Sequence, residues 1–396
     1  MTSAAGRWGE DGFTLVEALI ASAILLMLVA VAFELLRTAE ITFVSQPEAI
    51  DLQQRLRVVA DRLTRDLIMA GAGFSRGKTR GSLAGLLAPI FPHRVGLRNP
   101  DPPGSFFEDR FTVLYVPPGA PEATIADPIV APVASVRINA APGCALVNQA
   151  CGFQAGTAVL IVDDGGRFNL FTVMAVAGDV VDVQLRDPVL AASFRPGASI
   201  AAAVVESYSI KSDPAAQDFQ LLEYDGYRSE QPLSDDIVGM RIEYFGDPAP
   251  PVIVRPLSDP AGPWTTYGPK PPLPGVDDPQ DAWPGGENCA FAALGAGHVP
   301  RLAVFGGPGD GLVPLGAAVL SDGPWCPDSL APNRFDADLL RVRRVRVTIR
   351  AQARSPGLRG TGALFARPGT SRGGGSAVPD AHVVIDVAPR NLNARR

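Results

Sequence analysis

Histidine is scarce in this chain of 396 residues, which contains only His93, His298 and His382, far apart in the sequence. Cysteine is nearly as scarce, and the spacing between Cys144 and Cys151 is longer than the short hook of a zinc site. The acidic residues form no EF-hand loop either. The sequence therefore predicts no metal site and no cofactor.

Motifs for covalent or nucleotide chemistry are also missing. Residues 73–77 match the G-x-S-x-G pattern literally, but a nucleophile elbow needs a strand before the serine, and a helix is expected here instead. Residues 72–79 approach a P-loop, except that Ala72 replaces the first glycine and no strand precedes it. We therefore expect a protein that is not an enzyme.

Positive charge is too sparse for a nucleic-acid partner. The chain has 35 lysine and arginine residues against 41 aspartate and glutamate residues, a net charge of -6, and no basic stripe that could neutralise phosphates. We expect no nucleic acid among its partners.

A long apolar run covers residues 13–36. Its two charges are Glu17 near the start and Glu34 near the end, and it contains no proline or glycine. A helix rises by about 1.5 Å per residue, so the run is long enough to cross the ~30 Å hydrocarbon core of a bilayer. The run predicts a single membrane-spanning helix.

Glu17 is unexpected in such a helix, because a carboxylate at that depth costs roughly 2.5–3.5 kcal/mol on insertion scales. A partner becomes available if the chain is cut after Gly12, since Phe13 then carries a free α-amine. The amine of a neighbouring subunit is the better placed partner, and burying the two charges as a pair removes most of the cost of burying either alone.

The residues from Gly12 to Glu17, followed by the apolar helix, resemble the class III signal of type IV pilins and type II secretion pseudopilins. The resemblance implies that a prepilin peptidase cuts after Gly12 and methylates Phe13, and that Glu17 meets the N-terminus of an adjacent subunit during assembly. It also implies a single-pass protein of the inner membrane with a periplasmic head, which later reaches the pilus at the cell surface.

Two other interpretations of the run remain open. A secretory signal peptide would be cleaved near residues 30–32, which read Ala-Val-Ala, but the region before the run is long and acidic for one. A plain single-pass anchor leaves Glu17 unexplained.

The region after the anchor predicts an amphipathic helix up to Gly71 and Gly73. Residues 45–48 have the spacing of a capping box and include Pro47, so we expect the helix to kink or restart there. Beyond it, apolar residues recur at helical spacing and predict a stripe that packs on a folded head. These residues are Leu52, Leu56, Val59, Leu63 and Leu67. Residues 54–73 resemble the helix end of PilW-like minor pilins and of J-type pseudopilins.

The rest of the chain predicts strands separated by turns. The expected strands cover residues 111–116, 133–138, 158–162, 168–176, 180–185, 200–210, 219–224, 237–245, 339–352 and 381–387. Residues 158–185 predict a meander with Asp-Gly turns. In residues 344–350, valine and isoleucine alternate with arginine and threonine, which predicts a strand with one solvated, basic face. The order of residues 208–244 also looks like PilW-type minor pilins, and the end of the chain resembles the C-terminus of that family.

Residues 246–336 form a proline- and glycine-rich insertion that carries Trp264, Trp283 and Trp325. We expect these tryptophans to anchor a long loop rather than to form an exposed recognition surface, because tryptophan is buried on average. Four cysteines suit an oxidising envelope compartment. Each of the two pairings that close a loop within one segment is expected to form a disulfide, namely Cys144–Cys151 and Cys289–Cys326.

Together these observations predict an α+β protein with a leader at residues 1–12, a pilin helix at 13–73 and a β-rich extracytoplasmic head at 74–396. The expected function is that of a PilW-like minor pilin, in few copies near the tip. Its expected partners are major and minor pilins, the prepilin peptidase, the inner membrane and the pilus assembly platform. One alternative is a J-type pseudopilin, although those chains are usually shorter. Another is a membrane-tethered envelope binding protein or adhesin that never joins a filament.

Overall fold

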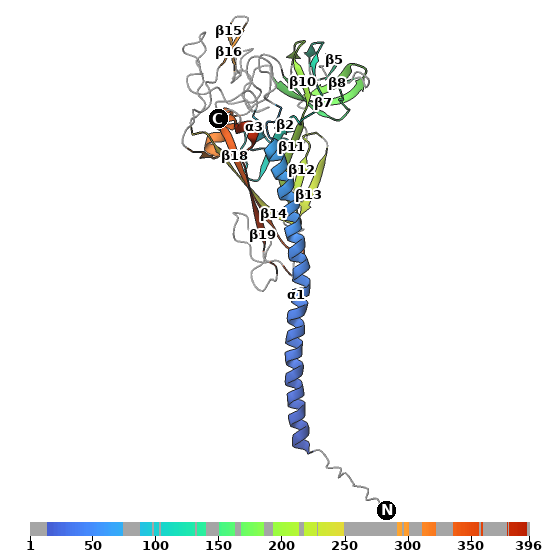
Figure 1. Ribbon diagram of the computed structural model, residues 1–396, viewed down its shortest axis with the longest axis vertical. Coiled ribbons are helices and arrows are strands. Elements are labelled where there is room, and N and C mark those ends of the chain that lie inside the picture. The colour runs from blue at the N-terminus through green and yellow to red at the C-terminus, as the bar shows by residue number, and fades with distance from the viewer. Residues whose placement is uncertain are drawn as a thin grey trace, which may run out of the picture.

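A computed structural model shows a long helix that carries a β-rich head at its C-terminal end (Figure 1). It describes residues 14–73, 88–96, 99–102, 104–130, 133–139, 150–162, 168–185, 193–213, 218–227, 229–248, 291–294, 297–300, 311–321, 336–355, 358, 378 and 380–393. Gly12 and Phe13, the residues on either side of the predicted cleavage site, lie outside this set.

Helix α1 spans Leu15–Met69, a single helix of 55 residues. Its first part, Leu15–Leu36, is long and apolar enough to cross a membrane and is not buried by any part of the chain that the structure describes. The predicted restart near Pro47 is wrong, because the helix continues through the proline. A proline in a helix interior costs about 3 kcal/mol, and packing of the following turns against the head offsets this cost.

Two antiparallel sheets pack on the second half of α1. The first has the order β1-β2-β11-β12-β13, formed by Ile90–Phe91, Arg110–Tyr115, Val204–Asp213, Asp218–Tyr224 and Glu230–Asp235. The second has the order β17-β14-β18-β19, formed by Val313–Leu315, Ile237–Gly246, Val342–Ala351 and Ala381–Val387. The helix contacts β2 and β13 of the first sheet and β18 and β19 of the second. The prediction of an antiparallel head packed on the helix is confirmed, with two sheets where one was expected.

The predicted stripe faces this core, and we call it the head-facing stripe. Its five residues, Leu52, Leu56, Val59, Leu63 and Leu67, are between 0% and 6% exposed. They share one apolar cluster with residues of both sheets, such as Phe111 on β2, Tyr208 on β11 and Val347 on β18. Burying a leucine side chain contributes about 1.5–3 kcal/mol. The stripe is therefore the main apolar contact between helix and head.

A closed six-stranded barrel is inserted between β2 and β11, and its strands follow the order β10-β3-β5-β8-β7-β6. They span Glu122–Ile125 (β3), Val133–Asn139 (β5), Ala158–Val162 (β6), Phe168–Ala177 (β7), Val180–Leu185 (β8) and Ser199–Ala202 (β10). Short strands β4 (Ile129–Val130) and β9 (Ser193–Phe194) pair beside it. The barrel has an apolar core of its own, separate from that of the two sheets. The predicted meander is confirmed as β6, β7 and β8, but its closure into a barrel was not predicted.

The barrel takes the place of a hairpin turn. Tyr115 at the end of β2 lies opposite Val204 at the start of β11, and the barrel occupies the chain between them. The predicted strand over residues 200–210 is therefore wrong. It is two strands in different sheets, and between them the backbone N–H of Ala203 bonds to the carbonyl of Ala158 on β6.

The last part of the head corrects two further expectations. Residues 337–341 form a short 3-10 helix, Ala337–Arg341, so the strand expected from residue 339 begins at Val342. The face of β18 expected to be solvated is only partly so, because Arg350 is 1% exposed and its Nε lies 3.7 Å from Asp380 Oδ2. The carboxylate beside it allows this arginine to be buried.

Little of the proline-rich insertion is described. Its later part includes strands β15 (Phe291–Leu294) and β16 (Gly297–Pro300), edge strand β17 and a short helix, Ala317–Leu320. The three tryptophans and the expectation about their packing lie outside the described residues. The last described residues form a helical turn, α3 (Arg390–Asn393), which contacts α1.

Candidate functional site

The start of α1 is closed by a reciprocal pair, Thr14 and Glu17. The Glu17 carboxylate accepts hydrogen bonds from the Thr14 backbone N–H at 3.0 Å and from the Thr14 hydroxyl at 2.8 Å. In return, the Glu17 backbone N–H donates to the Thr14 hydroxyl oxygen at 3.3 Å. This is a capping box, and it satisfies donors that the first helical turn leaves unpaired. The sequence predicted a role for Glu17 but not this one, although the Thr-x-x-Glu spacing is its signature.

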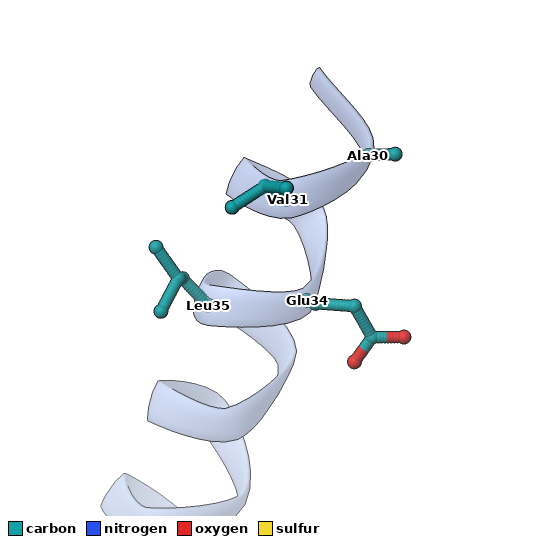
Figure 2. A pocket seen from close by; sticks show the side chains of 4 residues that line it. All are labelled: Ala30, Val31, Glu34 and Leu35. Atoms are coloured by element: carbon teal, nitrogen blue, oxygen red, sulfur yellow. The ribbon is translucent and has the colours of Figure 1, made fainter. Parts of the chain in front are cut away.

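The membrane-spanning part of α1 exposes apolar side chains on every side. Leu15, Leu26 and Leu35 are 78%, 69% and 68% exposed. The second carboxylate of the segment, Glu34, projects outward from the helix beside Ala30, Val31 and Leu35 (Figure 2), and these four line a shallow open groove on the helix surface. A helix that is apolar all round needs an apolar environment, which a bilayer or other helices supply.

A buried carboxylate joins the upper part of α1 to the first sheet. Asp66 is 0% exposed, although it lies outside the apolar positions that predicted the head-facing stripe. It accepts hydrogen bonds from the hydroxyls of Tyr208 and, at 3.2 Å, of Tyr115. Arg62, one turn earlier, places its Nε 3.4 Å from the same carboxylate. The pKa of the Tyr208 hydroxyl is raised, first by burial and then by the Asp66 charge, so this tyrosine stays a donor.

Arg62 connects this carboxylate to two more on the sheet. It donates to Glu223 on β12, with Nε at 3.1 Å from Oε1, and its terminal nitrogen lies 3.9 Å from Glu206 on β11. Burial, and then the charge of Glu223, raises the pKa of Glu206 to about 8, while Arg62 opposes this shift. We call these six residues the junction cluster: Arg62, Asp66, Tyr115, Glu206, Tyr208 and Glu223.

A second polar contact lies lower on the helix, where α1 leaves the head. Arg55 bonds to Asp51 of its own helix at 2.9 Å and to the backbone carbonyl of Asp235 at 3.1 Å. It also lies 3.4 Å from Asp236 Oδ2 and reaches the carbonyl of Gln352 at the end of β18. A planar guanidinium can hold several oxygens at once, so Arg55 links both sheets to the helix.

The C-terminal end of α1 is fixed by glycine and by α3. Gly73 has φ +77°, and a Cβ there would lie 2.6 Å from the Cβ of Val116. The predicted end of the helix near Gly71 and Gly73 is confirmed. The side chain of Asn391 in α3 donates to the carbonyl of Ala70 at 3.4 Å, so α3 closes the helix end.

Some predicted residues cannot be placed against one another. Cys151 is disulfide-bonded, and its partner lies outside the described residues, as do Cys289 and Cys326. The pairings Cys144–Cys151 and Cys289–Cys326 therefore stay predictions. The serine of the G-x-S-x-G match also lies outside. Within the described ranges, histidine, cysteine and carboxylate side chains form no group that could hold a metal ion.

Comparison with known proteins supplies one match. A family model described as the prokaryotic N-terminal methylation motif matches residues 9–33, a segment that includes Gly12, Phe13 and Glu17. No curated protein and no solved structure matches the chain. The match covers the signal and most of the anchor, and none of the head.

The methylation motif and the apolar helix that follows it define a class. They support a type IV pilin-like protein that is anchored in the membrane by a single helix. Such a signal implies processing by a prepilin peptidase and assembly with other pilins in general.

Proposed function

We propose that this protein is a minor pilin of a type IV pilus, present in few copies at or near the filament tip. The observation that carries the proposal is the methylation motif at residues 9–33, placed on a helix that runs without a break into the core of the head. A plain membrane tether has no need of a carboxylate at Glu17, because the charge only raises the cost of insertion.

Glu17 acts in assembly by exchanging partners. Before assembly, its charge is partly satisfied by the neutral donors of Thr14. The α-amine that cleavage creates on a neighbouring subunit is a cation, so its bond to the Glu17 carboxylate adds a charge–charge attraction that the neutral donors of Thr14 cannot supply, and this attraction is stronger in an apolar environment than in water. The exchange therefore favours an assembled helix over a solitary one.

The junction holds head and helix together while the helix leaves the membrane. The head-facing stripe supplies apolar contact, and Asp66 and Arg55 supply directional bonds to both sheets. Any force on the helix is thereby transmitted to the head. The bulk of the head supports a terminal position, because the barrel and the insertion at residues 246–336 would both have to be repeated beside every neighbour along a shaft.

Processing is the direct test. Gly12→Val should leave an uncut precursor, because the valine side chain crowds the scissile bond. Gly9→Val, at another glycine of the leader, should be cut normally. Mass spectrometry of the envelope protein should find N-methylated Phe13 as the mature N-terminus in the wild type. A mature N-terminus after Ala32 would refute the pilin assignment.

The copy number and position of the protein in filaments test the proposal that it lies in few copies at the tip. Quantitative labelling of purified filaments should find the protein at one end and in a small ratio to the major subunit. Decoration along the whole shaft would contradict the terminal position. A normally processed protein that never enters filaments would favour the tethered adhesin instead.

A further inference from the structure

The junction cluster brings more negative than positive charge to the contact between α1 and the first sheet. The carboxyl groups of Asp66, Glu206 and Glu223 lie around one guanidinium, that of Arg62. These side chains are 0%, 17%, 20% and 29% exposed, in the same order. If all four groups were charged, three negative charges would meet one positive charge. Like charges so close together, and so poorly solvated, favour the uptake of a proton.

Glu206 is the member of the cluster whose negative charge has the least support. Asp66 accepts hydrogen bonds from two tyrosine hydroxyls, and Glu223 accepts one from Arg62 at 3.1 Å. Within the part of the chain that the structure describes, the Glu206 carboxyl has one ion pair, with Arg62 at 3.9 Å, and no hydrogen bond. Burial, and then the charge of Glu223, raises its pKa to about 8. The proton is therefore assigned to Glu206.

The other titratable groups around Glu206 do not remove this imbalance. Asp225, which directly follows β12, adds a further negative charge, and its carboxylate already accepts hydrogen bonds from the backbone N–H groups of Tyr227 and Ser229 at 2.8 and 3.0 Å. Tyr115 on β2 and Tyr208 on β11 direct their hydroxyls at the carboxylate of the helix. The positive charge that faces Glu206 is that of Arg62, which it shares with two other carboxylates.

The backbone around the cluster decides which element responds to a change of charge. Strand β11 is bonded to β2 on one side and to β12 on the other, so the backbone of Glu206 is fixed. Helix α1 is held below by Arg55 and above by the backbone bond from Gly71 N–H to the carbonyl of Leu114 at 3.0 Å. Between these points it is held by side chains alone, so these turns are the part that can loosen.

We propose that Glu206 is a proton sensor in the link between helix and head: it is protonated in the folded protein at neutral pH, and loss of its proton weakens the contact of residues 59–66 of α1 with the first sheet. The ionised carboxylate competes with Asp66 for Arg62 and repels Glu223 across a gap that admits little water. Opening the contact hydrates these charges, so opening becomes easier as the pH rises. The strength with which α1 holds the head thus depends on the pH of the surroundings.

The accessibility of an introduced thiol tests the contact in the purified full-length protein in detergent. Val59 is 0% exposed in the head-facing stripe, whereas its neighbour Val58 is 56% exposed. The rate of alkylation by iodoacetamide is measured for Val59→Cys and for Val58→Cys, and their ratio removes the effect of pH on the thiol itself. Between pH 6 and pH 9 this ratio should rise by about tenfold. In the Glu206→Gln background it should stay nearly constant, because no proton can be lost.

A thiol in the barrel core distinguishes a local change from a general one. Val159 is 0% exposed and belongs to the separate core of the barrel, so Val159→Cys should show no comparable rise. Hydrogen exchange of residues 59–66, referred to that of β6, gives the same comparison without a substitution in α1. A constant ratio in the wild-type background, the same rise with Glu206→Gln, or an equal rise at Val159 would each overturn the proposal. None of these outcomes depends on whether the protein enters filaments.

Discussion

Replacement of Glu206 by glutamine should stabilise the head at alkaline pH and have little effect in acid. Glu206 is largely buried beside Glu223, and its pKa is raised to about 8 from an ordinary value of 4.5. Between pH 4.5 and about 8, the Glu206 carboxyl therefore keeps its proton in the folded state and loses it in the unfolded state. The corresponding stability is fully present below pH 4.5 and is lost as the pH rises through about 8.

The structure sets the size of the effect. At about 1.4 kcal/mol for each tenfold change in proton affinity, the difference between 4.5 and about 8 corresponds to at most about 5 kcal/mol. The side chain of Glu206 is still 17% exposed, and Arg62 lies 3.9 Å from it. Both reduce the cost of the charge, so we expect Glu206→Gln to gain about 1–3 kcal/mol at pH 9.

Urea unfolding of the full-length protein in detergent at pH 5 and pH 9 measures this difference. His93 changes charge in acid, since burial lowers its pKa to about 4, and its stability is lost as the pH falls below 6.5. That contribution is the same in both proteins and cancels in their difference. Glu243→Gln on the exposed face of β14 is the control and should shift the midpoint equally at the two pH values. If Glu206→Gln gives the same shift at pH 5 and pH 9, the reasoning about the junction cluster is refuted.

Three further outcomes are expected. Glu17→Gln should insert into the membrane and be processed normally but fail to join filaments, whereas the control Glu34→Gln should join them. Normal incorporation of Glu17→Gln would contradict the exchange of partners. Leu63→Ala should cost about 2–5 kcal/mol of unfolding free energy, because it leaves a cavity under the helix, and Val130→Ala should change it by less than about 0.5 kcal/mol. Peptide mapping without reduction should find Cys151 bonded to the nearest cysteine before it, and a bond to either distant cysteine would overturn the predicted pairing.

Elements with a strong local signal could be predicted from the sequence. The apolar run at residues 13–36 and the leucine spacing from Leu52 to Leu67 specify a helix and its buried face, because both depend on periodicity alone. The alternation in β14 and β18 specified two strands in the same way. The restart predicted at Pro47 was wrong because the local cost of a proline is visible in the sequence, whereas the packing that offsets this cost is not.

The barrel could not be predicted from local sequence patterns. Residues 158–162 read as a continuous apolar run, and the structure explains why: Val159 and Ile161 point into the barrel core, while Leu160 and Val162 belong to the core of the two sheets. Burial on both faces removes the alternation that marks a half-buried strand. Closure depends on β10 pairing with both β3 and β6, and these strands are too far apart in sequence for any short pattern to connect them.

The junction cluster could not be predicted from the sequence for a related reason. Asp66 carries the ordinary signature of a solvated helix position, and only the fold brings two tyrosine hydroxyls to it. A buried carboxylate without partners would be costly, so its position depends on Tyr115 and Tyr208 arriving from separate strands. Glu17 is the opposite case, because both of its donors at the helix start belong to one residue, Thr14, which lies three positions before it.

The edges of the sheets bear on how the head meets its neighbours. An open edge invites another strand, and proteins guard against this with short strands, proline or cover. Here β1 is two residues long, β17 contains Pro314, and β13 contains Pro232 beside an irregularity in its pairing with β12. The fourth edge of the two sheets that pack on α1, β19, contacts the helix, and the barrel has no edge at all. Strand addition to the two sheets that pack on α1 and to the barrel is therefore disfavoured. Association with other subunits through these elements is left to side chains on their surfaces.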